Sequence, residues 1–217
     1  NNLFQEYKKT INLLNKIQLI KEKKIKNFKN KNYKIPQYNY DILFKETELF
    51  CDWYVKKKIL GYKKTNLNIL LKKQIKILIS KLKLKNNTFV HRDFHVSNIM
   101  KVNKKYALID NQDALIGNKA YDLASLIDDV RFKTTDKLKK KIYNYYLKSN
   151  NEKINQLKFK NDFEILSVLR NLKIIGIFTR LATRDGKKKY LNMIPYAWNL
   201  IELRLVANPI FKDLKDL

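Results

Sequence analysis

Glycine is scarce in this chain of 217 residues, which contains only four of them. They stand at positions 61, 117, 176 and 186, and no two lie close together. A Walker-type phosphate loop and a G-x-G-x-x-G dinucleotide loop each need several glycines within a few positions. Neither of these nucleotide-binding loops can therefore be written anywhere in the sequence.

Cysteine is also scarce, and long apolar runs are missing. The single cysteine, Cys51, excludes an internal disulfide framework and cannot build a zinc site alone, so we interpret it as a small buried hydrophobe. No apolar run approaches the roughly 18 residues that a membrane span needs. The first ten residues lack the pattern of a signal peptide. We expect a cytoplasmic protein with no membrane partner, and the sequence leaves its oligomeric state open.

Basic residues are abundant, and the formal net charge is +27. Such a charge is compatible with a polyanionic partner. Lysine, asparagine and isoleucine are, however, spread along the whole chain, as in a protein encoded by an A/T-rich genome. A nucleic-acid surface would more often gather arginine and aromatic residues in one patch. We therefore expect no specific nucleic-acid partner.

Hydrophobic periodicity predicts a mostly helical fold. The chain is 45% hydrophobic and long enough to bury a core as one domain or a compact pair of subdomains. Residues 21–40 indicate a basic connector, and residues 183–186 a turn. Two β-prone runs, 99–102 and 106–109, flank a polar turn and predict a hairpin. The fold class is mainly α with a small β-hairpin insertion (α+β). Helices are expected over residues 3–20, 41–60, 66–84, 121–130, 136–148, 161–182 and 195–206.

Residues 91–98 read His-Arg-Asp-Phe-His-Val-Ser-Asn and match the kinase catalytic-loop pattern H-R-D-x-x-x-x-N. In that pattern Asp93 would orient the proton of an attacking hydroxyl, and the oxygen of Asn98 would hold a metal. A hairpin brings its two ends together, so Asn98, just before the first strand, is expected beside Asp110, just after the second. Carboxylate and amide oxygens suit Mg²⁺. The alternative without a functional role is that Asp93 is a solvated aspartate and that Asn98 caps a turn with its amide.

Four neighbouring residues carry more open interpretations. Asp113 would join the metal or substrate pocket, or simply stand in a turn. Gly117 is expected to supply a turn conformation that a side chain would hinder. Asp122 is expected to brace the catalytic loop or cap a helix, and His95 either lies beside the site or faces solvent.

These residues together resemble the aminoglycoside phosphotransferase and choline kinase-like superfamily. The resemblance rests on HRDFHVSNIM, on the I-D-x-x-x-A-x-x-G segment at 109–117 and on the Y-D-L-A of residues 121–124, in that order. Within the superfamily the sequence is most similar to bacterial kinases that phosphorylate the anomeric hydroxyl of N-acetylmuramate and N-acetylglucosamine. Residues 48–54, 109–114 and 176–187 carry that closer likeness.

The resemblance implies roles for individual residues. Asp93 would be the catalytic base, and Asn98 and Asp110 would bind Mg²⁺ and, through it, ATP. Glu48 and Asp113 would be weaker candidates on the substrate side. Asn111 departs from the pattern, because relatives commonly carry an aromatic residue there.

The resemblance covers residues 1–217 as a protein-kinase-like C-terminal lobe, with residues 88–117 forming the catalytic loop and metal-binding hairpin. The strand-rich N-terminal lobe that covers ATP in such kinases is absent, which implies that this chain alone binds ATP poorly and is inactive without it. The implied function is Mg²⁺-dependent transfer of the ATP γ-phosphoryl group to a small-molecule hydroxyl, expected to belong to an amino sugar. The alternatives are an aminoglycoside- or choline-type acceptor and a truncated, non-catalytic binding module.

Overall fold

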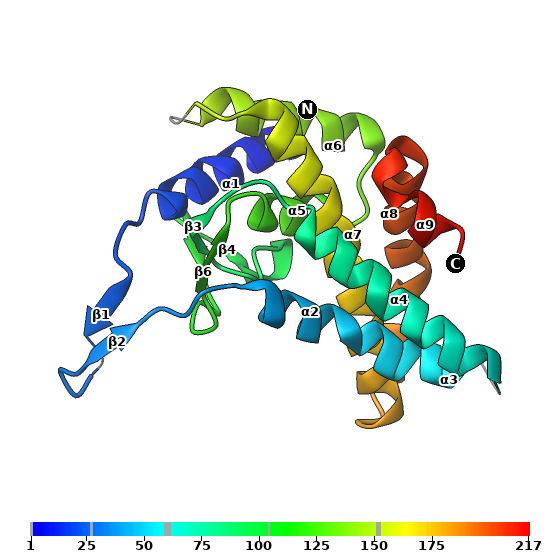
Figure 1. Ribbon diagram of the computed structural model, residues 1–217. Coiled ribbons are helices and arrows are strands. Elements are labelled where there is room, and N and C mark those ends of the chain that lie inside the picture. The colour runs from blue at the N-terminus through cyan, green and yellow to red at the C-terminus, as the bar shows by residue number, and fades with distance from the viewer. Residues whose placement is uncertain (1, 27, 59–61, 104, 151–152) are drawn as a thin grey trace. The chain divides into compact units, whose positions relative to one another are not determined.

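The computed structural model describes residues 2–26, 28–58, 62–103, 105–150 and 153–217 (Figure 1). Helices dominate this part of the chain, and its strands form three two-stranded sheets. The mainly α fold class with a small β component is therefore confirmed. The chain divides into two compact units, the first made of Asn1–Asn39 and Lys83–Phe163 and the second of Tyr40–Leu82 and Glu164–Leu217.

The first unit is built on α1 (Asn2–Gln18), which packs against α6 (Asp136–Ser149). Tyr7, Ile11 and Leu14 follow one another at helical spacing and are all buried. Gln18 ends the helix by accepting a hydrogen bond from the Tyr146 hydroxyl at 2.6 Å through its side-chain oxygen. The helix predicted over residues 3–20 is thus confirmed, and so is the one predicted over residues 136–148.

After α1 the chain forms a short hairpin where the sequence predicted only a connector. Its strands are β1 (Lys24–Lys26) and β2 (Asn32–Lys34), which pair antiparallel. Every residue of both strands is exposed. A strand that buries neither face leaves no alternation of apolar and polar residues, and this explains why the pattern did not reveal it.

A second antiparallel pair joins β3 (Asn86–Val90) to β6 (Leu115–Asn118), and β6 was not predicted at all. Gly117 lies inside β6, so its expected turn role is wrong. A Cβ added at Gly117 would lie 2.9 Å from the Cβ of Tyr38. The position needs glycine because another segment packs closely against it, and not because the backbone turns there.

Asp162, in α7 (Gln156–Thr183), fastens three segments of the first unit together. Its buried carboxylate accepts hydrogen bonds from the main-chain nitrogens of Lys83 and Leu84, each at 2.8 Å at its shortest. The same carboxylate accepts the side-chain amide of Asn118 at 2.7 Å. Several N–H donors compensate the cost of burying this carboxylate.

The second unit holds α2 (Tyr40–Leu49), followed by a π-helical segment, η1 (Phe50–Val55), and by α3 (Lys56–Lys58). The helix predicted over residues 41–60 is therefore continuous but changes its winding, and its end, with Gly61, lies outside the described residues. A Cβ on Gly176 of α7 would lie 2.4 Å from the carbonyl carbon of Leu49. Glycine lets the two helix backbones approach where the winding changes.

Of the remaining helices of the second unit, α4 and α8 were predicted and differ by a few residues at their ends, whereas η3, η4 and α9 were not predicted. Proline occupies the first turn of α8 as predicted, and Gly186, in the turn predicted after α7, has a φ of 69°. The bounds are α4 (Tyr62–Ser80), η3 (Lys188–Met193), α8 (Ile194–Ala207), η4 (Pro209–Phe211) and α9 (Lys212–Lys215).

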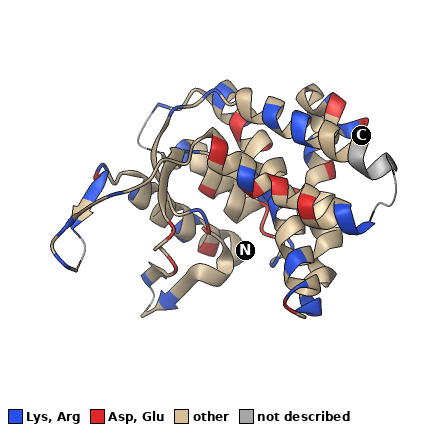
Figure 2. Ribbon diagram, turned by 60° about the horizontal axis from the view of Figure 1, so that its bottom comes forward, with Lys and Arg blue, Asp and Glu red and all other residues tan. Residues whose placement is uncertain are grey.

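Lysine and arginine residues occur on most helices and on the β1–β2 hairpin (Figure 2). Within the described residues, no helix is both long and apolar enough to cross a bilayer.

Candidate active site

Residues 91–98, here called the catalytic loop after the kinase pattern that they match, leave β3 at Val90 and are held first by Asp122, which lies in α5 (Tyr121–Ile127). The buried carboxylate of Asp122 accepts the main-chain N–H of His91 at 2.7 Å and that of Arg92 at 2.9 Å. Arg92 has a φ of 79°, a conformation that is costly for a residue with a side chain. Two charge-assisted hydrogen bonds hold it there, so the bracing role predicted for Asp122 is confirmed.

Asp93 and Asn98 are brought together by the loop itself. Between them lies a short 3-10 turn, η2 (Val96–Asn98), whose last N–H donates to the carbonyl of His95 at 3.0 Å. The side-chain nitrogen of Asn98 donates to the main-chain oxygen of Asp93, also at 3.0 Å. Because the nitrogen of that amide is engaged, its orientation is fixed and its oxygen is directed away from the Asp93 carbonyl.

The hairpin after the loop is formed by β4 (Ile99–Val102) and β5 (Lys105–Leu108), as predicted. The N–H of Ile109 donates to the main-chain oxygen of Asn98 at 3.1 Å, so the two ends of the hairpin meet. Asp110 follows directly, with a φ of 65°, and its exposed carboxylate accepts a hydrogen bond from the Gln112 side chain at 2.6 Å. The neighbourhood of Asn98 and Asp110 inferred from the hairpin is thus present in the fold.

His91 links the loop to the segment that carries Asp110. Its ring is buried, and its Nε2 lies 3.0 Å from the main-chain oxygen of Ile109. Burial lowers the pKa of His91, and the hydrogen bond to Ile109 opposes that shift without cancelling it. A neutral ring with its proton on Nε2 donates to this carbonyl. His95 is also buried, so the solvent-facing alternative for it is wrong.

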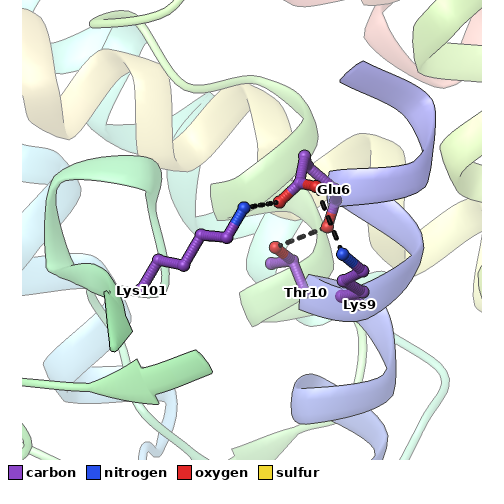
Figure 3. Close-up of polar contacts among 4 residues, drawn as sticks. All are labelled: Glu6, Lys9, Thr10 and Lys101. Atoms are coloured by element: carbon purple, nitrogen blue, oxygen red, sulfur yellow. Dashed lines mark hydrogen bonds and ion pairs between the residues drawn. The ribbon is translucent and has the colours of Figure 1, made fainter. Parts of the chain in front are cut away.

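Strand β4 of the hairpin is tied to α1 by Glu6 (Figure 3). Its carboxylate pairs with Lys101 of β4 and with Lys9, each at 3.3 Å. Burial raises the pKa of Glu6, but the hydrogen bonds from the two lysines outweigh it, so the pKa lies below its ordinary value. Glu6 and Val96 also line a groove of about 230 Å³ between α1 and the catalytic loop.

The two weaker substrate candidates lie in different parts of the fold. Asp113 is exposed, within a turn closed by a hydrogen bond from the Ala114 N–H to the Asn111 oxygen. Glu48 belongs to the second unit, where Lys72 pairs with it at 2.5 Å and with Asp52 at 3.4 Å. Burial lowers the pKa of Lys72, but the hydrogen bonds and charges of Glu48 and Asp52 outweigh it, so the pKa lies above its ordinary value. Glu48 thus carries a local counterion.

Cys51 stands beside this group and is fully buried, as expected for a small hydrophobe. Burial raises the pKa of its thiol to about 12, so the group stays protonated and unreactive at neutral pH.

The oxygen atoms beside the loop fit a hard divalent cation. The Asn98 side-chain oxygen and the Asp110 carboxylate are the kind of ligand that Mg²⁺ takes, together with phosphate oxygens and water. Within the described residues, no three His, Cys, Asp or Glu side chains gather into a metal cluster.

One residue at the loop carried no signal in the sequence. Asp129 follows α5, and its buried carboxylate accepts the main-chain N–H of Val96 at 3.2 Å. Its neighbour Asp128 looks the same in the sequence but pairs with Lys139 at 3.1 Å. Only the folded structure distinguishes the two.

With the geometry established, comparison with known proteins assigns the chain to a family. A family model described as the phosphotransferase enzyme family matches residues 40–157, more than half of the sequence. The chain belongs to this family. The superfamily resemblance drawn from residues 91–98 and 109–117 is thereby confirmed.

Curated relatives within this family are named as sugar kinases. The N-acetylmuramate/N-acetylglucosamine kinase of Neisseria meningitidis is 32% identical over 177 residues, covering 77% of this chain and 52% of that protein. The enzyme of the same name from Pseudomonas aeruginosa is 30% identical over 189 residues, covering 84% of this chain and 56% of that protein. The chain thus spans about half the length of the curated relatives it matches.

A solved structure supports the fold alone. An ethanolamine kinase of Plasmodium vivax superposes with a TM-score of 0.60 at 16% identity, covering 96% of this chain and 60% of that one. A kinase-like fold is therefore shared at low sequence identity.

Proposed function

We propose that this chain is the catalytic part of an ATP-dependent kinase that phosphorylates a hydroxyl of an amino sugar. The observation that carries the proposal is the hydrogen bond between Asn98 and Asp93. Asp110 lies near Asn98 in the fold, because it directly follows Ile109, whose N–H donates to the main-chain oxygen of Asn98. A catalytic aspartate and two oxygen ligands are the constellation on which phosphoryl transfer depends.

Asp93 is assigned the role of the residue that accepts or orients the proton of the attacking hydroxyl. Its main-chain oxygen is fixed by the Asn98 amide, and the backbone ahead of it is held by Asp122. The side chain itself is half-buried, which leaves it accessible to a substrate. Positioning of this kind supplies much of the rate enhancement in phosphoryl transfer.

Asn98 and Asp110 are assigned to Mg²⁺. When bound, the ion neutralises charge on the phosphate oxygens that develops during transfer. The chain contributes a fixed amide, locked by its bond to Asp93, and an exposed carboxylate held in place by Gln112.

The acceptor is assigned from the relatives. Two proteins at 32% and 30% identity are named N-acetylmuramate/N-acetylglucosamine kinase, so an N-acetylated amino sugar is the proposed acceptor class. Glu48 and Asp113 remain the proposed substrate-side residues. Glu48 is the weaker of the two as a free carboxylate, because Lys72 already neutralises it.

The test is a phosphotransfer assay with ATP and Mg²⁺, run on the chain of 217 residues and on the product of its complete reading frame. The acceptors are N-acetylmuramate, N-acetylglucosamine, an aminoglycoside, choline and ethanolamine. We expect the product of the complete reading frame to phosphorylate the amino sugars and to lose about 10²- to 10⁴-fold in turnover on Asp93→Asn, the usual contribution of a general base. Turnover with choline alone would overturn the acceptor, and turnover with none of them would support a non-catalytic module.

A further inference from the structure

We propose that Asp129 is a positioning residue for the metal, acting through the turn that carries Asn98. This inference rests on the function proposed above. It concerns a residue that touches neither Mg²⁺ nor substrate in that scheme, and whose role is to fix the residue that does.

The contacts of Asp129 converge on the start of the turn. One carboxylate oxygen accepts the N–H of Val96, the first residue of η2, at 3.2 Å. The other accepts the N–H of Arg131 at 2.9 Å and lies 3.6 Å from the guanidinium of the same residue. The side chain of Asp129 is 1% exposed. A buried carboxylate that is bound from both sides has one available orientation.

The bond to Val96 matters because of where that N–H stands. The first N–H groups of a helical turn have no partner within the turn, so an outside acceptor decides where the turn begins. Asn98 is the last residue of the same turn, and its N–H returns to the carbonyl of His95. A shift at Val96 is therefore passed directly to Asn98.

Asp122 and Asp129 then hold the loop from its two ends. Asp122 binds the backbone just before Asp93, and Asp129 binds it just before Asn98. Both carboxylates come from one short segment around α5, so the same segment positions the proposed base and the proposed metal ligand. A metal ligand positioned by such an outer contact typically loses 10- to 100-fold in metal affinity when the contact is removed.

The chain offers a matched control in Asp128. It is adjacent to Asp129, equally buried and also paired with a cation, since the Lys139 ammonium lies 3.1 Å away and donates to the Ile127 carbonyl at 2.7 Å. None of these contacts involves the catalytic loop. Asp128→Ala should therefore cost stability without changing the metal site.

The experiment measures Mn²⁺ binding to the 217-residue chain by the loss of the free-ion signal in electron paramagnetic resonance. Each variant is measured at a temperature well below its own thermal unfolding midpoint. We expect Asn98→Ala to abolish binding and Asp129→Ala, which removes both acceptor oxygens, to raise the Mn²⁺ dissociation constant about 10-fold or more. Asp128→Ala should change the constant less than about twofold, although its thermal unfolding midpoint falls as far as that of Asp129→Ala. Equal weakening by both aspartate variants would overturn the inference, because it would show only a general loss of structure.

A second variant separates the mechanism from fold stability. Val96→Pro deletes the N–H that Asp129 binds, and His95, with φ −136° and ψ 167°, already has the extended backbone that a following proline requires. In the Val96→Pro background, Asp129→Ala should weaken Mn²⁺ binding less than about twofold, because the contact with the Val96 N–H no longer exists. A persisting tenfold effect would contradict the proposed route.

Failure of the inference and of the proposed function can be told apart. Binding that depends on Asn98 but not on Asp129 would remove only the positioning role. A chain that binds no Mn²⁺, or binds it equally well after Asn98→Ala, would overturn both.

Discussion

The side-chain nitrogen of Asn98 lies 3.0 Å from the main-chain oxygen of Asp93, so the proposed metal ligand is hydrogen-bonded to the proposed base. Asn98→Asp keeps an oxygen for the metal but loses the donor to Asp93. We expect it to lower the free energy of unfolding by about 1 kcal/mol, the usual net value of one hydrogen bond, in urea titrations. Asn103→Asp, in the exposed hairpin turn, is the control and should change stability by less than about 0.5 kcal/mol.

Asp122 carries a larger share of the loop's stability. Replacing it with alanine leaves the N–H groups of His91 and Arg92 without their acceptor in a buried position. Since each unsatisfied buried donor costs about 1–3 kcal/mol, we expect a loss of roughly 2–5 kcal/mol in urea unfolding. Asp122→Asn, which keeps one acceptor oxygen, should fall between wild type and alanine. Equal stabilities for all three would show that the clamp contributes nothing.

The buried ring of His91 predicts a pH dependence of stability. Burial lowers its pKa in the folded state below the value of the unfolded chain, so the unfolded state binds more protons as the pH falls. The stabilising contribution is fully present above the unfolded pKa of about 6.5 and is lost as the pH falls through the folded pKa. His91→Gln, which retains a donor for Ile109, should therefore flatten the stability profile between about pH 7 and 5. An unchanged slope would exclude His91 as its source.

Two glycines of the second unit predict different costs for the same substitution. Gly176→Ala places a methyl group 2.4 Å from the carbonyl carbon of Leu49, and a backbone atom cannot move aside cheaply. We expect a loss of about 3 kcal/mol or more, at the upper end of overpacking effects. Gly186→Ala meets no atom within 4 Å, but its φ of 69° is strained for alanine, so about 1 kcal/mol is expected. Similar thermal unfolding midpoints for the two variants would contradict the close approach at Leu49.

The sequence predicted the helices and the catalytic loop because both leave local patterns. Apolar spacing marked α1, and residues 91–98 together with the β4–β5 hairpin were recognisable from a few consecutive residues. The family followed from the same short stretches. Local information was sufficient for these elements because their interacting residues are neighbours in the chain.

Most of the failures depend on partners that are distant in the chain. β6 is only four residues long and pairs with β3, so Gly117 looked like a turn residue until the approach of Tyr38 was known. The π-helical winding after Leu49 is associated with Gly176 on another helix. Asp129 escaped notice because nothing in the sequence distinguishes an aspartate that binds a loop from its neighbour that binds a lysine.

The hub at Asp162 has a consequence for how the protein forms during synthesis. Residues 40–82 interrupt the first unit in sequence, and the unit ends at Phe163. Asp162, whose carboxylate binds Lys83, Leu84 and Asn118, is therefore one of the last residues of that unit to be translated. The kinase motif is translated well before that point. During synthesis on the ribosome, the segments on either side of the loop therefore cannot be joined by these hydrogen bonds until a residue outside the motif has been made.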